Sequence, residues 1–496
     1  MRATVTSHTL QVTRHTSQIT SALMAGAWLL MATGCATNPA TGKRELMLVS
    51  ESQEIQMGRE ADADVRKTMG VYDDAAWQKY VTDVGMRLAR ASHRPNLPWK
   101  FTVVDEPAVN AFALPGGFIY ITRGILPYLR DEAELAAVLG HEVGHVDARH
   151  GASQASKQIV AGVGIALGGV LAPKYKTAFG LAGGGLGLLF LKYGREDELE
   201  ADRLGTGYAA SAGWDPAGMP GLLDTLAKID EVGGSSRGVP NWALTHPPAA
   251  DRVQKVQESV SAAKAASPGG TARNRPQLEE RLAGVVFGDS REKGMVRGRE
   301  FVHPVMRFAL TFPQGWEISN SDDAVTAQPT GDANATIILQ AGAPSGNLQQ
   351  TADASMLKAG FQRVDGSSRT INGLPFFIGT YQGVIEKNRA TAEAGFVRLN
   401  GRDDVFRILG VAPEAQFSNV RPAADATIES FRELSQSEAN AIQNRRIEFV
   451  TVRNGDTWVS IAAAGGNVVK PTTLAIINGE APASQPRPGS RVRTVR

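Results

Sequence analysis

The segment VLGHEVGHVDARH, residues 138–150, places three histidines and a glutamate in what otherwise reads as an apolar helix. His141 and His145 are four residues apart, so on an α-helix both imidazoles project from one face and can bind the same metal ion. Glu142 follows the first histidine, in the order H-E-x-x-H that is the signature of zinc hydrolases. Ionisable groups in an apolar helix are costly unless something pairs with them. The alternative to a metal site is a helix with two hydrogen-bonded histidines.

The predicted helix covers residues 131–150 and ends at Gly151, a residue type favoured just after a helix. A catalytic zinc ion takes three protein ligands and leaves one position open to water, so a third ligand is needed. His150 is the nearest candidate, but the metzincin pattern requires glycine three and histidine six residues after the second histidine. Those positions hold Ala148 and Gly151. We therefore expect His150 to close the helix, where a positive side chain favours the helix dipole.

The segment YGREDELEADRLG, residues 193–205, offers better candidates for the third ligand. Glu198 and Asp202 are four residues apart on a predicted second helix, so one carboxylate can bind metal while the other supports it. A natural task for Asp202 is to accept the free N–H of a ligating histidine and so fix its tautomer. The alternative is a solvated acidic face, because the same segment carries three further acids: Glu196, Asp197 and Glu200.

HEVGHVDARH followed by GREDELEADRLG resembles the metallopeptidase family of the CAAX prenyl proteases and HtpX, which pairs H-E-x-x-H with a later E-x-x-x-D. Three more stretches are similar to the soluble periplasmic branch of that family, typified by BepA and LoiP: NPATGKRELMLVSESQEIQMG, NAFALPGGFIYITRGIL and ALTHPPAADRV. The resemblance covers roughly residues 38–257. Position 194, often serine in the family, is glycine here, and we expect no loss of chemistry from that.

The resemblance implies one zinc ion per chain, bound by His141, His145 and Glu198. Glu142 would act as general base, taking a proton from zinc-activated water and delivering it to the leaving amine. Asp202 would support a ligating histidine. His246, in THPPAADR, matches a family histidine that closes on the metal as a fourth ligand or stabilises the developing oxyanion.

These features together favour a zinc-dependent endopeptidase. AFALPGGFIYI would supply an edge strand on which an extended peptide pairs through backbone hydrogen bonds. Because that mode reads backbone more than side chains, it suits unfolded or misassembled envelope proteins as substrates, in envelope quality control. The alternatives are a non-proteolytic envelope chaperone or assembly scaffold, and a cell-wall-binding lipoprotein. The intact Glu142 argues against a scaffold, which has no need of the base.

The N-terminus predicts export and lipidation. Residues 19–33 are a short apolar run after a region with arginines and no acid, which is typical of a secretory signal. The run closes in ATGC, which resembles a bacterial lipobox and predicts a signal peptide over 1–34 and acylation of Cys35. Ala36, in place of Asp, indicates the outer membrane, with the protein body in the periplasm. The alternative is a plain signal peptide followed by an incidental cysteine.

Composition excludes some partners. Lys and Arg number 52 against 50 Asp and Glu, a net charge of +2, so the chain lacks the basic footprint of a nucleic-acid binder. Residues 158–191 are apolar and Gly-rich, but Pro173 and two lysines divide them into halves shorter than the roughly 20 residues of a spanning helix. We expect two helices packed through glycine there. The alternative is a membrane-facing or subunit-facing surface.

Sequence character divides the mature chain into three units of an α+β protein. Residues 35–260 are the expected metallopeptidase domain, mainly helical and zincin-like with a small sheet, and 261–300 are a linker rich in small residues. Residues 301–435 alternate strands and turns, which predicts an antiparallel α+β binding or spacer domain. Residues 447–496 resemble a LysM module of strand, two helices and strand, which implies peptidoglycan as a partner.

Overall fold

The computed structural model describes residues 35–160, 193–232, 242, 246, 252–321, 324–330, 334–342, 346–385 and 388–496. The predicted signal peptide and nearly all of the Gly-rich stretch 158–191 lie outside these residues. Within the described part of the chain, no helix combines the length and the apolar character needed to cross a membrane. The fold mixes helices and strands, so the predicted α+β class is confirmed.

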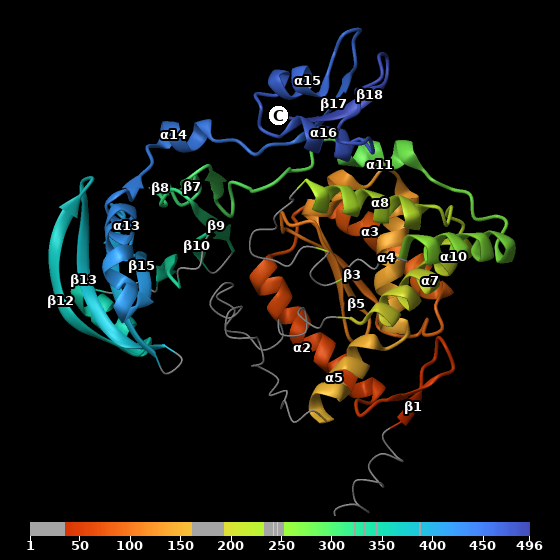
Figure 1. The fold of residues 1–496 in the computed structure, drawn as a ribbon, viewed down its shortest axis with the longest axis horizontal. Coiled ribbons are helices and arrows are strands. Elements are labelled where there is room, and N and C mark those ends of the chain that lie inside the picture. Colours follow the sequence, from red (N-terminus) through yellow and green to blue (C-terminus); the bar gives the residue numbers. More distant parts are fainter. Residues whose placement is uncertain are drawn as a thin grey trace, which may run out of the picture.

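The N-terminal body is mainly helical, and its helices surround a small sheet (Figure 1). A short antiparallel hairpin precedes them, made of β1 (Cys35–Thr37) and β2 (Arg44–Leu46). The described helices are α2 (Glu51–Met69), α3 (Ala75–Ala91), α4 (Glu132–Asp147), α5 (His150–Val160), α7 (Arg195–Ser211), α8 (Gly218–Glu231), α10 (Arg252–Ala266) and α11 (Arg275–Leu282). Helix α4 is buried along its whole length, as its apolar sequence predicts.

The small sheet has three strands in the order β3-β5-β4. Strand β5 (Phe118–Thr122) pairs in parallel with β3 (Lys100–Val104) and antiparallel with β4 (Ala111–Leu114). Gly116 and Gly117 turn the chain between β4 and β5 with φ of 80° and 101°, a backbone region that glycine adopts most easily. AFALPGGFIYI therefore forms a hairpin whose first strand lies at the edge of the sheet.

Helix α4 ends earlier than the sequence indicates. It stops at Asp147, and α5 starts at His150, so the prediction of one helix over 131–150 closed by Gly151 is wrong. Gly151 instead lies in the first turn of α5, and His150 opens that helix rather than closing α4. The expected role of His150 at a helix C-terminus is wrong for the same reason.

The break between the two helices is made by Arg149, which adopts the left-handed φ of 58°. That conformation is uncommon for a residue other than glycine and persists only when its surroundings hold it. Arg149 Nε donates to Glu54 Oε2 at 3.0 Å, and Nη2 donates to the Val49 carbonyl at 2.8 Å. The N-terminal segment and α2 thus fix the turn that ends α4.

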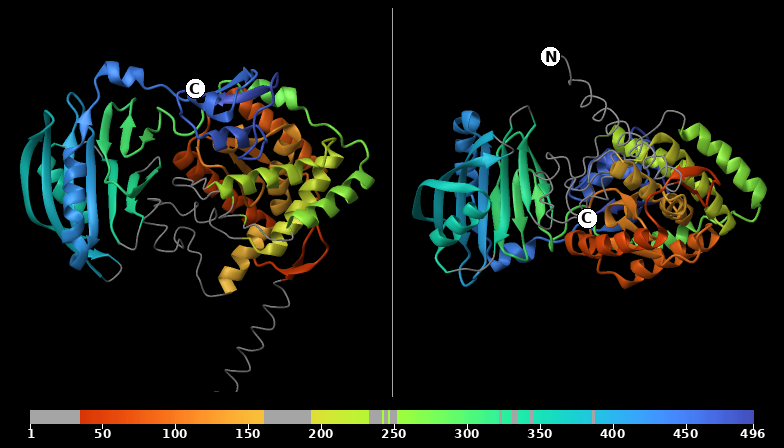
Figure 2. Two further views of the ribbon diagram at one scale, coloured as in Figure 1. Left: turned by 45° about the horizontal axis from the view of Figure 1, so that its top comes forward. Right: turned by 90° about the horizontal axis from the view of Figure 1, so that it is seen from below.

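The second lobe is an antiparallel α+β structure, as the sequence predicts, and lies to one side of the helical body (Figure 2). One sheet has the order β12-β13-β14-β15-β11-β10-β9 and the other β16-β8-β7-β6. The strands are β6 (Met295–Arg297), β7 (Glu300–His303), β8 (Phe308–Thr311), β9 (Trp316–Asn320), β10 (Val325–Pro329), β11 (Thr336–Gly342), β12 (Phe361–Ile371), β13 (Leu374–Ile385), β14 (Asn388–Arg398), β15 (Val405–Pro413) and β16 (Arg432–Glu433). Helices α12 (Leu348–Lys358) and α13 (Phe417–Glu429) pack on the larger sheet, and α14 (Gln436–Ala441) leads away from it.

The C-terminal unit has the expected strand-helix-helix-strand order: β17 (Ile447–Thr451), α15 (Trp458–Ala464), α16 (Pro471–Ile477) and β18 (Arg491–Val495). It packs against the helical body, where Ile447 exchanges backbone hydrogen bonds with Gly284 and Val285 at 2.8 and 2.9 Å. Arg493 is 2% exposed and donates to the Pro127 carbonyl at 2.9 Å. The apolar residues of this unit belong to the same buried core as those of the helical body, and Figure 1 shows the unit lying on that body.

The stretch 261–300, predicted as a linker, contains regular structure. Helix α10 continues into it as far as Ala266, and α11 and β6 follow. Alanine is the best helix former, so the small residues that suggest a linker also suit a surface helix. Val286 pairs with Arg446 in an isolated bridge, which ties this stretch to the start of the C-terminal unit.

Candidate metal centre

Small residues allow α4 and α7 to cross closely. A Cβ atom on Gly205 would lie 2.6 Å from the backbone of Gly140, and one on Gly144 would lie 2.9 Å from the Ala201 carbonyl. Real Cβ atoms essentially never come so near to backbone, so the crossing requires these residues. Gly140 and Gly144 directly precede the two histidines of the H-E-x-x-H motif. The crossing therefore brings the α7 carboxylates close to those histidines.

Four buried side chains converge at the crossing, and one ligand atom from each lies within 4.8 Å of all the others: His141, His145, Glu198 and His246. The Nε2 atoms of His141 and His145 are 3.0 Å apart, and His145 Nε2 is 3.4 Å from Glu198 Oε1. His246 Nδ1 is 3.0 Å from the same oxygen. Ligand atoms of tetrahedral zinc, with bonds near 2.1 Å, are about 3.4 Å apart. The set fits zinc in both size and chemistry.

Glu142 lies beside these donors with its carboxylate fully buried. Neither of its oxygens has a hydrogen-bond partner among the described residues, and Oε1 is 3.5 Å from His246 Nε2. Leaving a buried acceptor unsatisfied costs free energy, so this position calls for a metal-held water or a substrate group. Burial raises the pKa of Glu142, against the effect of the neighbouring histidines. A carboxylate with a raised pKa is a stronger base.

Asp202 contacts the ring nitrogen of His141 that points away from the other donors. Its Oδ1 lies 2.9 Å from His141 Nδ1, while Arg252 donates to Oδ2 at 2.6 Å and to Oδ1 at 3.0 Å. Burial opposes ionisation, but hydrogen bonds from His141 and Arg252 hold the pKa of Asp202 below its usual value. The charged carboxylate therefore accepts the Nδ1–H of His141 and leaves Nε2 facing the other donors.

The electrostatics of the cluster suit a metal. Burial would raise the pKa of Glu198, but the charge of His246 and hydrogen bonds from His145 and His246 hold it well below its usual value. Burial lowers the pKa of His145. Burial also acts to lower the pKa of His246, but Glu198 and Glu142 raise it overall. A charged carboxylate and a neutral imidazole are the forms that coordinate a metal, so the shifts of Glu198 and His145 suit metal binding, whereas the shift of His246 favours its protonated ring.

Three further residues complete the site and were not predicted. Arg252 Nη1 is 3.0 Å from Glu198 Oε2, in addition to its contacts with Asp202. The Tyr193 ring stacks on His145 with centroids 3.9 Å apart, and the Trp242 ring stacks on His246 at 4.2 Å. The position of Arg252, six residues after His246 in the THPPAADR stretch, is the one signal that points to it.

All six residues singled out from the sequence lie together in this cluster: His141, Glu142, His145, Glu198, Asp202 and His246. His150, which the sequence does not favour as a metal ligand, is not among the four donors. It contacts His145 instead, with the two Nδ1 atoms 2.9 Å apart.

The comparisons with known proteins cover the same region. The sequence model of Peptidase family M48 matches residues 75–260. Mitochondrial metalloendopeptidase OMA1 of Arabidopsis thaliana is 34% identical over 216 residues, which is 42% of either chain. The beta-barrel assembly-enhancing protease of Escherichia coli (strain K12) is 31% identical over 220 residues, 42% of this chain and 44% of that one. The match thus spans less than half the length of these two relatives.

A third relative is matched over more of its length. Mitochondrial metalloendopeptidase OMA1 of Schizosaccharomyces pombe is 32% identical over 253 residues, 48% of this chain and 71% of that protein. The family match includes α4, α7 and His246, so it contains every residue of the cluster. With the donors assembled as described, these matches show that the chain belongs to peptidase family M48.

Proposed function

We propose that the chain is a zinc-dependent endopeptidase that cleaves unfolded or misassembled proteins of the cell envelope. The supporting observation is the carboxylate of Glu142, which is buried beside four side chains that could bind a metal and has no hydrogen-bond partner for either oxygen among the described residues. An unsatisfied buried carboxylate lowers stability and would serve no purpose in a scaffold. It is, however, where a hydrolase needs its base.

When bound, zinc supplies a Lewis acid that activates water and polarises the scissile carbonyl. The chain's own residues do the rest of the work. Asp202 orients His141, and Glu142 accepts a proton and passes it to the leaving amine. The edge strand β4 offers its backbone to an extended substrate segment. Pairing of that kind selects unfolded chains, because a folded protein does not present a free extended backbone.

His246 provides the fourth donor in the cluster. Four protein ligands are typical of structural zinc sites, whereas catalytic sites keep one position open. We propose that the arrangement with His246 among the donors is a latent form of the enzyme. Replacing His246 with alanine then increases cleavage. A loss of cleavage with zinc retained would assign His246 to stabilising the developing oxyanion instead.

We also propose that acylated Cys35 anchors the protein to the periplasmic face of the outer membrane. The name of the E. coli relative refers to β-barrel assembly, which fits an envelope location. Asn38 donates to the Ala148 carbonyl at 3.1 Å, so the chain after Cys35 is bound to the end of α4. A lipid at Cys35 would hold the peptidase close to the membrane. Mass spectrometry of the membrane fraction, with Cys35→Ser as the soluble comparison, tests this.

Peptidoglycan is a proposed partner of residues 447–496, because their strand-helix-helix-strand order is that expected of a LysM module. Val459 on α15 is 64% exposed and gives the unit an apolar contact point. Deleting the unit would expose the core that it shares with the helical body. The better test is sedimentation of the full chain with peptidoglycan, compared with Val459→Asp. If neither the full chain nor the variant sediments with peptidoglycan, glycan binding is removed from the proposal.

The proposed activity is tested with the full chain and Glu142→Gln on an unfolded protein substrate, with zinc content measured in parallel. We expect both proteins to hold zinc, and the variant to cleave about 100- to 10,000-fold more slowly, the usual contribution of a general base. Equal cleavage would overturn the role of Glu142. Absence of cleavage by both zinc-loaded proteins would favour the scaffold.

A further inference from the structure

His150 lies behind His145, on the side away from the cluster of donors. Its Nδ1 is 2.9 Å from His145 Nδ1, and its Nε2 is 3.1 Å from Glu200 Oε2. His150 is 1% exposed, so its contact with His145 is buried, whereas its contact with Glu200 is partly buried. The three side chains form one line from the proposed metal ligand to an acidic residue on α7.

The proton positions along this line follow from the chemistry of imidazole. His145 Nε2 faces Glu198 and His141, so it must be unprotonated to bind a metal. The proton of neutral His145 is then on Nδ1, which donates to Nδ1 of His150. His150 in turn carries its proton on Nε2 and donates it to Glu200. Each bond in the line therefore has one direction when a metal is bound.

The chain conformation brings His150 to this position. On an uninterrupted helix, a residue five positions after His145 would point about 140° away from it. The left-handed backbone of Arg149 breaks the helix at that point, and α5 starts again with His150 turned back toward His145. The hydrogen bond from Arg149 to Glu54 holds the break in place. The unfavourable backbone conformation of Arg149 is thus maintained at the position where it directs His150 towards His145.

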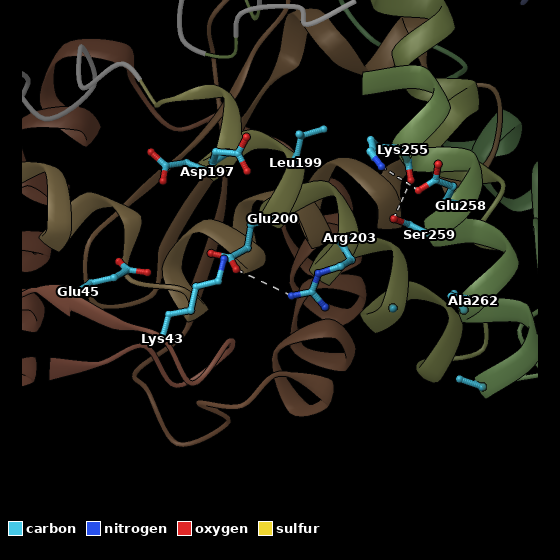
Figure 3. A pocket seen from close by; sticks show the side chains of 14 residues that line it. Lys43, Glu45, Asp197, Leu199, Glu200, Arg203, Lys255, Glu258, Ser259 and Ala262 are labelled. Atoms are coloured by element: carbon cyan, nitrogen blue, oxygen red, sulfur yellow. Dashed lines mark hydrogen bonds and ion pairs between the residues drawn. The ribbon is translucent and has the colours of Figure 1, made fainter. Parts of the chain in front are cut away.

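The outer end of the line reaches solvent. Asp197 and Glu200 line a pocket of about 720 Å³ between α7, α10 and the segment after β1, and Figure 3 shows both side chains there. The Glu200 side chain is 16% exposed and lies 4.0 Å from Arg203. A carboxylate at this position is a strong acceptor for the His150 Nε2–H.

We propose that His150 is a positioning residue for the metal site, which fixes the tautomer and ring orientation of His145, with Glu200 orienting His150 in turn. The proposal rests on the zinc site of the proposed function. It assigns to His145 an imidazole support where His141 has a carboxylate, Asp202. No contact of His150 with substrate is needed for this role.

Three substitutions in the full chain separate positioning from packing. His150→Asn keeps an acceptor near the Nδ1 position, His150→Gln moves its polar group towards Glu200, and His150→Leu keeps bulk without an acceptor. The measurements are the zinc dissociation constant, by competition with a chromogenic chelator, and the melting temperature of the zinc-free protein. We expect His150→Gln and His150→Leu to bind zinc about 10- to 100-fold more weakly, and His150→Asn to stay within about threefold of the wild type.

The outcomes are distinct. Equal affinities for the Asn and Gln variants, or wild-type affinity in His150→Leu, would overturn the positioning role while leaving the zinc site intact. Losses of zinc affinity that follow the melting temperature of the zinc-free variants would assign His150 to packing and also overturn it. Absence of zinc binding by the wild type would instead refute the proposed function.

Discussion

The two faces of α7 carry the same kinds of residue in opposite environments. On the inner face, Glu198 and Asp202 are at most 1% exposed and contact histidines and Arg252. On the outer face, Glu196 and Glu200 line an open pocket together with two lysines and Arg203, and Figure 3 shows Glu200 and Arg203 there. Residue type therefore does not decide which acid can bind metal. The crossing with α4 decides which acid can bind metal, because this crossing buries the inner face of α7 and places His141 and His145 against that face.

The largest expected effect distinguishes the two faces directly. Glu198→Gln removes a charged ligand, so we expect zinc affinity to fall by more than the roughly 100-fold typical of losing an outer hydrogen-bond partner. Glu196→Gln, two residues away and exposed, should change it by less than twofold. Both are measured by chelator competition on the full chain. Similar losses for the two variants would contradict the contrast between the faces.

The helix crossing itself can be tested with two glycines of α7. A Cβ at Gly205 would lie 2.6 Å from α4 backbone atoms, whereas one at Gly207 would meet nothing within 4 Å. We expect Gly205→Ala to lower the free energy of unfolding by about 3 kcal/mol and to weaken zinc binding. Gly207→Ala should raise stability by up to about 1 kcal/mol through helix propensity. Urea titration measures both.

Gly205→Ala with wild-type zinc affinity and stability would show that the crossing is looser than described. In that case the inner face would not depend on contact between the helices.

Zinc removal should affect the helical body and spare the second lobe, because their buried cores are separate. At a free zinc concentration 100 times the dissociation constant, binding adds about 2.7 kcal/mol of stability. We expect calorimetry to show one transition that falls by about 5–10 °C in chelator and a second that does not move. A shift of both transitions would mean that the lobes unfold together.

The smallest effect expected on the inner face comes from Asp202→Asn. The amide keeps an oxygen for His141 but loses the charge that also binds Arg252. We expect zinc affinity to fall by about 10- to 100-fold, with the fold retained. Chelator competition measures the zinc affinity, and circular dichroism shows whether the fold is retained. An unchanged affinity would mean that His141 needs no charged partner.

Local periodicity predicted much of this fold and part of its site. The i, i+4 spacing of His141 and His145 determines their common face without reference to the rest of the chain. Glu198 is different, because more than fifty residues separate it from them and no spacing rule covers that distance. Only the family resemblance selected it from its acidic neighbours. Arg252 was missed because its role depends on contacts that exist only in the folded state.

The end of α4 shows why some features leave no trace in sequence. Gly151 looks like a helix stop, yet the residue with positive φ is Arg149. Arginine has no preference for that conformation, and here contacts with Glu54 and Val49 impose it. Tertiary interactions overrode the local preference, and the same change moved His150 from a supposed helix end to a contact with His145.

The packing of β18 on the helical body has a consequence for how the metal centre assembles. Arg493 reaches Pro127 across 366 residues of chain, next to the start of the helix that carries the motif. The core around that helix is complete only when the unit formed by residues 447–496 has packed onto it. Formation of the metal centre would thus depend on a segment that lies 366 residues further along the chain than Pro127.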